Sequence, residues 1–137
     1  QMDIVHARAR AVLGRYYARA KENELAMQYY SGALDILSDQ ADPHSAVEVA
    51  MLLGQVLSDA GRKEEAAEHY IDALVLAEAN DFRMLQGELL ARLGEVESDR
   101  SQKMDYLQRS LSVFRELGAV DRMREVQTSV HRAVMGH

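Results

Sequence analysis

The side chains that could bind a metal or carry out catalysis are scattered along this sequence. A helical metal site needs two ligands about one turn apart with a carboxylate on the same face. No pair of the five histidines meets this requirement. They are His6, His44, His69, His131 and His137. The sequence therefore predicts no metal site and no cofactor.

The remaining reactive side chains also lack a catalytic arrangement. Glu64, Glu65 and Glu68 cluster at the start of a predicted helix, where carboxylates interact favourably with the helix dipole. The sequence has no glycine-rich phosphate loop, no nucleophile elbow and no serine–histidine–aspartate order that suggests a triad. Because it has no cysteine, it offers neither a thiol nucleophile nor a disulfide. We expect no catalytic residues and a protein that is not an enzyme.

The composition limits the remaining function classes. The 137 residues are 47% hydrophobic and 28% charged, as in a folded globular domain. The net charge of −6 argues against direct binding to nucleic acid. No apolar run approaches the roughly 20 residues that span a bilayer, so we expect a cytoplasmic protein without a membrane partner. The beginning of the chain, 1–6, is not a signal peptide and is compatible with a fragment of a longer protein.

The elements that would position these side chains repeat along the chain. Leu-Gly pairs occur at an even spacing of 40 residues, at 13–14, 53–54 and 93–94. After the first two pairs the pattern Ala-x3-Tyr-x2-Ala recurs, at 26–33 and at 66–73. A period of this length indicates a solenoid built from one supersecondary unit. We therefore predict an all-α solenoid of antiparallel helical hairpins.

Apolar spacing and turn signals predict seven helices, at about 3–20, 24–38, 43–60, 63–79, 82–98, 102–117 and 120–135. Asp42-Pro43 is a strong helix start; Gly61 and Gly118 are stops. Asn80-Asp81 is expected to end the helix before it and to cap the next one, and Ser101 to cap the helix at about 102–117. The short connections favour antiparallel neighbours in one domain, 1–137. It would hold repeats at about 3–38, 43–79 and 82–117, followed by a capping helix at about 120–135.

The same spacing predicts which residues face the core. In the first helix the expected core stripe consists of Ala9, Val12, Leu13, Tyr16, Tyr17 and Ala20. A glycine inside a helix costs about 1 kcal/mol relative to alanine. The repeated glycines therefore indicate close approach between the two helices of a hairpin. We expect Tyr30 and Tyr70 to fill the space between hairpins.

These residues resemble the tetratricopeptide repeat, in which Leu-Gly-x2-Tyr in one helix is followed by Ala, aromatic and Ala in the next. The first repeat matches at Leu13, Gly14, Tyr17, Ala26, Tyr30 and Ala33. The second matches at Leu53, Gly54, Ala66, Tyr70 and Ala73, with Leu57 in the tyrosine position. The third keeps Leu93 and Gly94, but has Glu97 in the tyrosine position and Lys103, Leu107 and Ser110 in the small, aromatic and small positions. The period exceeds the usual one of about 34. It therefore resembles the long-repeat variety of MalT-like activators and signalling scaffolds.

The resemblance implies a concave groove lined by the first helix of each hairpin. The stripe beside the core stripe supplies these candidate groove residues: Arg8, Arg15 and Arg19; Glu48, Met51, Gln55 and Asp59; Glu88, Glu95 and Asp99. The charge changes from basic in the first helix to acidic in the third, which could orient a partner. The alternative is that these are ordinary solvated helix faces. Ala11 and Arg15 stand where some family members hold a Lys–Asn clamp for a C-terminal carboxylate, so that clamp is absent.

Three functions remain open. The first is a scaffold or interaction module that binds a peptide or helix of another protein in the groove. The second is a regulatory domain of a larger signalling protein or transcriptional regulator, where the repeats sense a ligand or inhibitor. The third is self-association, in which the basic end of one groove meets the acidic end of another to form a homo-oligomer.

Overall fold

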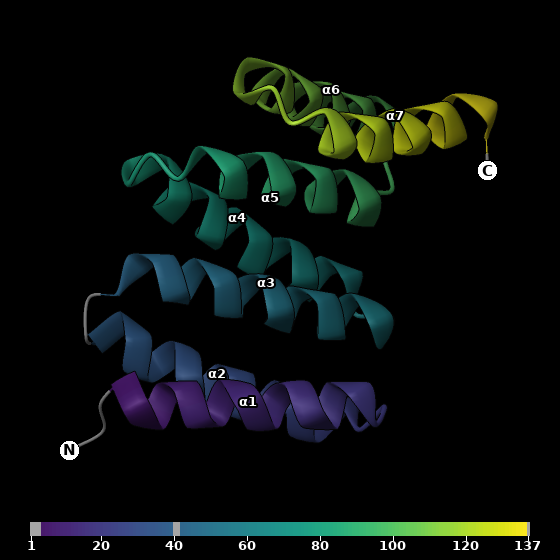
Figure 1. Cartoon of the computed structure of the whole chain (residues 1–137). Helices are drawn as coiled ribbons and strands as arrows, with labels where there is room; N and C mark the ends of the chain where they lie inside the picture. The colour runs from purple at the N-terminus through teal and green to yellow at the C-terminus, as the bar shows by residue number, and fades with distance from the viewer. Residues whose placement is uncertain (1–3, 40–41, 137) are drawn as a thin grey trace.

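The structure is a computed structural model that describes residues 4–39 and 42–136. Within these residues it contains seven helices and no strand, which confirms the all-α prediction (Figure 1). The helices are α1 (Ile4–Arg19), α2 (Asn23–Asp39), α3 (Pro43–Asp59), α4 (Lys63–Ala79), α5 (Arg83–Val96), α6 (Arg100–Leu117) and α7 (Val120–Met135). Where both ends are described, the predicted ends agree within two residues.

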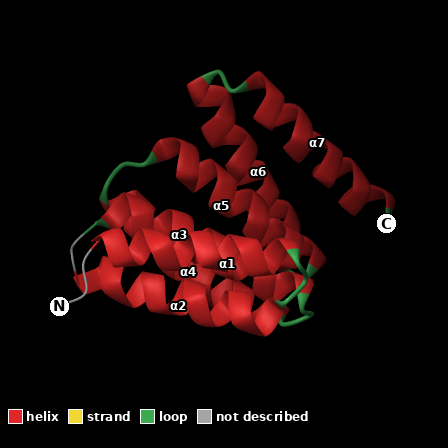
Figure 2. Cartoon of the chain, turned by 60° about the horizontal axis from the view of Figure 1, so that its bottom comes forward, coloured by secondary structure: helices red, strands yellow, loops and turns green. Residues whose placement is uncertain are grey.

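The helices stack in chain order. Each helix packs mainly against the helix before it and the helix after it, and α3 also touches α5. Figure 1 shows the result as a solenoid, with α1 and α2 at one end and α6 and α7 at the other. Figure 2, turned to bring the lower end forward, shows that short loops join consecutive helices. This arrangement places α1, α3, α5 and α7 along one side of the stack.

Local sequence explains several helix ends. The Asp42 carboxylate accepts a hydrogen bond from the Ser45 amide at 3.2 Å, and Pro43 begins α3. After α3, Gly61 has φ +82° and stops the helix in the left-handed conformation, as predicted. Gly118, with φ +68°, does the same after α6.

Two predicted caps were wrong. Asp99, rather than Ser101, caps α6, because its carboxylate accepts a hydrogen bond from the Gln102 amide at 3.0 Å. Asp81 lies in the left-handed region with φ +57°, which ends the preceding turn. Helix α5 therefore begins after Phe82 without a side-chain cap.

The repeated glycines and aromatic residues pack within each hairpin. A Cβ built on Gly14 would lie 2.6 Å from ring carbons of Tyr30, and Gly54 faces Tyr70 in the same way. The buried tyrosines therefore fill the space inside a hairpin, and the prediction that they lie between hairpins was wrong. In the third repeat the substitute Leu107 approaches the position of a Gly94 Cβ at 2.6 Å.

The predicted core stripe of α1 was wrong at five of its six positions, since only Tyr17 packs against the core. Val12 is 61% exposed, Leu13 40% and Tyr16 65%, and Ala9 and Ala20 are exposed as well. The residues of α1 that are buried are Ala7, Ala11 and Gly14. The repeat counterpart of Leu13 in α3, Leu53, is only 2% exposed because α3 packs between α2 and α4.

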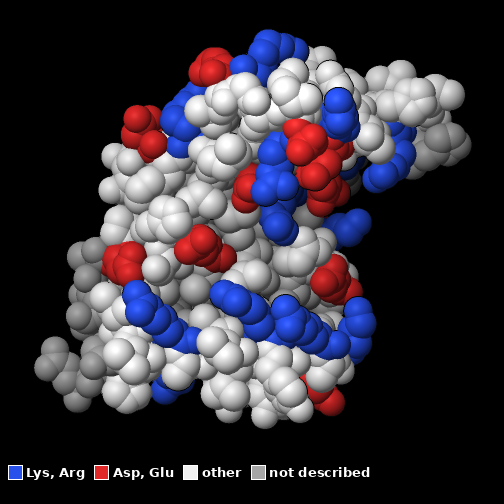
Figure 3. Space-filling view, viewed as in Figure 1, with Lys and Arg blue, Asp and Glu red and all other residues white. Residues whose placement is uncertain are grey.

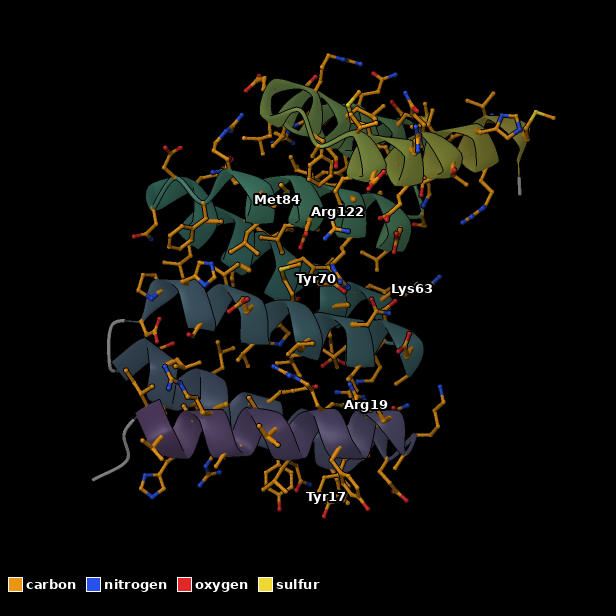
Figure 4. The ribbon with its side chains drawn as sticks, viewed as in Figure 1. Tyr17, Arg19, Lys63, Tyr70, Met84 and Arg122 are labelled. Atoms are coloured by element: carbon orange, nitrogen blue, oxygen red, sulfur yellow. The ribbon has the colours of Figure 1, made fainter. Side chains whose placement is uncertain are left out.

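Helix α1 packs mainly on α2, and its apolar stripe forms an exposed end face. Half-buried Tyr17 lies beside this face and stacks on Tyr29 with the ring centroids 5.5 Å apart. Figure 4 shows Tyr17 on the side of α1 that points away from α3.

Candidate functional site: a groove along α1, α3, α5 and α7

The odd-numbered helices line two neighbouring cavities on one side of the stack. The first has a volume of about 410 Å³ and lies among α1, α3 and α5. Its lining residues are Ala7, Arg8, Ala11, Arg15, Leu37, Ser45, Glu48, Val49, Met51, Leu52, Leu85, Glu88 and Arg92. The second, of about 280 Å³, is lined by Gln55, Glu88, Ala91, Arg92, Glu95, Phe114, Arg122, Glu125, Val126 and Ser129. Because Glu88 and Arg92 line both cavities, we describe them together as one groove.

The structure brings most of the predicted groove residues together. Arg8, Arg15, Glu48, Met51 and Glu88 line the first cavity. Gln55, Glu88 and Glu95 line the second. Sequence spacing therefore located much of the groove wall.

The other three predicted groove residues lie at its margin or outside it. Arg19 lines neither cavity, although Figure 4 shows it on the side of α1 that faces α3. The exposed Asp59 carboxylate accepts a hydrogen bond from Gln55 Nε2 at 2.9 Å. Asp99 lies beyond the end of α5 and caps α6, so its predicted place on the third groove stripe was wrong.

Sequence reasoning missed several groove residues. Leu52, Leu85 and Arg92 line the first cavity but were left out of the predicted stripe. Helix α7 was interpreted only as a cap, yet it contributes Arg122 to the second cavity. The available signal was the three- and four-residue spacing of the polar side chains Arg122, Glu125 and Ser129.

Two acidic side chains of the groove, Glu48 and Glu88, lie beside a basic side chain of the protein. The Glu88 carboxylate pairs with Arg122 at 3.1 Å, a contact that crosses from α5 to α7 (Figure 4). The Glu48 carboxylate lies 3.3 Å from His44 Nδ1, which forms an ion pair when the histidine is protonated. Arg92 donates a hydrogen bond to Gln55 Oε1 at 2.6 Å. Polar contacts therefore bridge α3 to α5, through Gln55 and Arg92, and α5 to α7, through Glu88 and Arg122.

The arginines on the α1 side of the groove differ from this network. Within the described residues, no acidic side chain forms an ion pair with Arg8, Arg15 or Arg19. All three are exposed. Figure 3 shows blue side chains in a row over the level of α1, below the hollow in the surface. This wall therefore offers cationic groups that are available to a ligand.

Two buried tyrosines, Tyr30 on α2 and Tyr70 on α4, lie close to groove arginines. Burial raises the pKa of Tyr30, and the nearby positive charges of Arg15 and Arg19 partly oppose this effect. Burial likewise raises the pKa of Tyr70, against the charge and hydrogen bonding of Arg92. The tyrosine hydroxyls are thus close enough to the groove arginines to feel their charge.

The described residues offer neither a metal site nor a membrane-spanning helix. No cluster of three or more histidine, aspartate or glutamate side chains there could hold a metal ion. No described helix has both the length and the apolar character needed to cross a membrane.

Comparisons with known proteins agree with the fold. Residues 51–112 match a family model described as tetratricopeptide repeat, and none of the curated proteins matches the sequence. The apo form of RapI is similar at a TM-score of 0.81 and 16% identity, over 98% of this chain and 54% of that one. The chain therefore spans about half the length of that structure.

Two other solved structures are complexes. A Rap protein complexed with competence and sporulation factor has a TM-score of 0.75 and 20% identity, over 98% of this chain and 41% of that chain. The TPR2AB domain of yeast Sti1 in a pHSP90 complex has a TM-score of 0.71 and 18% identity, over 93% of this chain and 48% of that chain. Together with the match at 51–112, these likenesses show that the chain has the helical-repeat fold of tetratricopeptide-repeat structures.

Proposed function

We propose that the protein is a non-catalytic interaction module that binds a peptide or a helix of another protein in the groove. The observation that carries this proposal is the groove wall on α1, where exposed arginines that form no ion pair within the described residues lie beside a cavity with a mixed polar and apolar lining. Charged groups at an interface mainly set the orientation and the association rate of a partner. The whole chain would act as one binding unit of the long-repeat variety.

A segment of polypeptide suits this site better than a compact small molecule. The two cavities continue into each other along four helices, and polar side chains occupy much of their lining. Small-molecule sites are more often enclosed and predominantly apolar. Two similar structures are complexes with a competence and sporulation factor and with pHSP90, which supports a protein or peptide partner here.

A pull-down with the charge-reversed variant Arg15→Glu, Arg19→Glu tests the proposal. The control is Arg109→Glu, Arg115→Glu, which makes the same change in net charge at exposed positions of α6 that line neither cavity. We expect the groove variant to lose the partner and the α6 variant to retain it. Unchanged recovery by the groove variant would contradict binding in the groove.

A second candidate function is that of a ligand-sensing regulatory domain within a longer signalling protein. The observation that favours it is that the chain spans only about half of RapI, together with the repeat spacing of 40 residues. The sequence surrounding these residues in the complete gene tests this alternative. An adjoining DNA-binding or signalling domain would support it, and a gene that encodes the repeats alone would exclude it.

A further inference from the structure

We infer that the segment bound in the groove is acidic and carries bulky apolar side chains, with its acids against α1 and its apolar groups in the larger cavity. This inference rests on the proposed function and specifies the chemistry of the partner. Three features of the groove support it: the one-sided charge of α1, the engagement of the opposing acids, and the apolar floor between them.

The charge of α1 is entirely positive. Helix Ile4–Arg19 contains four arginines and no acidic residue. Arg8, Arg15 and Arg19 follow one side of the helix at intervals of seven and four residues. The fourth, Arg10, lies instead against α2, near Gly32. Three of the four arginines thus face the groove side, where carboxylates of a ligand could reach them.

The acids across the groove do not neutralise this wall. Glu88 is engaged by Arg122 on α7, whereas the charge of Glu48 is balanced only when the neighbouring His44 is protonated. Arg92 adds a further positive charge to the lining of the larger cavity. The lining of the larger cavity therefore holds three arginines and two carboxylates, an excess of positive charge, although the chain as a whole carries −6. A long polyanion such as nucleic acid would meet the rest of that negative surface, whereas a short acidic segment would not.

The floor beside the arginines is apolar and adaptable. Ala7 and Ala11 are small and leave space next to α1, while Met51 and Leu85 supply larger surfaces from α3 and α5. Methionine adjusts readily to different ligand shapes. The cavity of about 410 Å³ lies within the range of roughly 300–1,000 Å³ that is usual for ligand pockets. It therefore suits leucine-like or aromatic side chains.

The arginine spacing sets the expected spacing of the ligand's acids. Positions 8 and 15 are separated by about 10 Å along the helix axis, at 1.5 Å per residue. An extended peptide would span this distance in about three residues, at roughly 3.3 Å per residue. A helix lying along α1 would instead need acids about seven residues apart. An extended segment in which acids and leucines are interspersed satisfies both the wall and the floor.

Three synthetic peptides test this chemistry. They share the same leucine positions and carry Glu, Gln or Lys at the positions between them. Their affinity is measured by fluorescence anisotropy at low and high ionic strength. We expect the Glu–Leu peptide to bind most tightly, and to weaken as the ionic strength rises. Tighter binding of the Gln–Leu or Lys–Leu peptide, or no binding of the Glu–Leu peptide, would overturn the inference.

Two protein variants show whether the arginine wall is responsible. The triple variant Arg8→Glu, Arg15→Glu, Arg19→Glu should have an affinity for the Glu–Leu peptide that is lower by roughly tenfold or more. The matched control is Arg109→Glu, Arg115→Glu, Arg124→Glu, at exposed positions outside both cavities. It should bind the Glu–Leu peptide as tightly as the unaltered protein does. Equal loss in the two variants would overturn the inference, and circular dichroism checks that both remain helical.

A reporter in the groove separates failure of this inference from failure of the proposed function. Because the chain has no cysteine, Glu48→Cys creates one labelling site in the groove, and Glu68→Cys creates one at an exposed position of α4. Both sites receive an environment-sensitive dye. If Gln–Leu or Lys–Leu binds best and changes only the Glu48→Cys signal, the acidic ligand is wrong but the groove remains. If bound peptide leaves that signal unchanged, both proposals fail.

Discussion

The ring of Tyr30 occupies the space that a side chain at position 14 would need. Cδ1 and Cε1 of this ring lie 2.6 Å from the position of a Cβ on Gly14. The same relationship recurs one repeat later between Tyr70 and Gly54. The glycine and the tyrosine of each hairpin therefore specify each other, and this pairing holds the two helices close together.

Gly14→Ala and Gly54→Ala should each destabilise the protein by about 1–3 kcal/mol, because the buried tyrosine ring has to move. This cost outweighs the gain of about 1 kcal/mol in helix propensity. Urea unfolding followed by circular dichroism measures the change. Gly32→Ala is the control, because its Cβ would meet only the mobile guanidinium of Arg10, at 2.7 Å. It should leave stability unchanged or raise it, and equal loss in all three variants would contradict this explanation.

Leu13 and Leu53 occupy the same repeat position in different environments, so their replacement by alanine should cost different amounts of stability. Leu53→Ala should cost about 2–5 kcal/mol, as for other buried leucines. Leu13→Ala should cost less than about 1 kcal/mol because this side chain lies on the uncovered face of α1. Urea unfolding of the two variants gives the comparison. Similar losses would mean that the α1 face is covered in solution.

These two leucines also show how far the sequence predicts the fold. Periodicity located the helices and the repeat because both depend on local spacing. It failed to predict which face of α1 is buried, since burial depends on how many helices pack against it, and α1 packs mainly against α2. The apolar stripe and the buried stripe are adjacent on the helix. The prediction chose the stripe with the larger apolar side chains, whereas the structure buries the one with Ala7 and Ala11.

The groove was partly predictable for the same reason. Arg8, Arg15 and Glu48 follow from the repeat geometry, because the groove stripe lies at a fixed angle from the core stripe. Arg92 and Arg122 were missed because their place in the groove depends on contacts between helices, with Gln55 of α3 and Glu88 of α5. A single sequence does not show which side chains pair between helices, although the polar spacing on α7 marks Arg122 as a candidate.

The start of α6 gives a test of a prediction that the structure corrected. Asp99→Ala should cost about 0.5–2 kcal/mol, because it removes the hydrogen bond from the carboxylate to the Gln102 amide. Asp99→Asn retains a capping oxygen and should have a smaller effect. Ser101→Ala should change little, since Ser101 is exposed and does not cap the helix. Thermal unfolding compares the three variants, and a larger effect at Ser101 than at Asp99 would place the cap where the sequence suggested.

Tyr30 and Tyr70 should make stability sensitive to alkaline pH. Burial raises the pKa of both hydroxyls in the folded state above the value of about 10 expected in the unfolded chain. Between these two values the unfolded state has already released the proton while the folded state still holds it. The stabilising contribution is therefore complete below about pH 10 and is lost as the pH rises through the folded-state pKa.

Urea unfolding at a series of pH values measures this loss. The variant Tyr30→Phe, Tyr70→Phe should lose less stability above pH 10 than the unaltered protein, because neither ring can ionise. Tyr16→Phe is the control, since Tyr16 is exposed on the end face, and it should follow the unaltered protein. Absorbance of the tyrosinate band follows the ionisation of the six tyrosines without overlap from tryptophan, which the chain lacks. Parallel stability profiles for all three proteins would show that the buried hydroxyls do not control the alkaline transition.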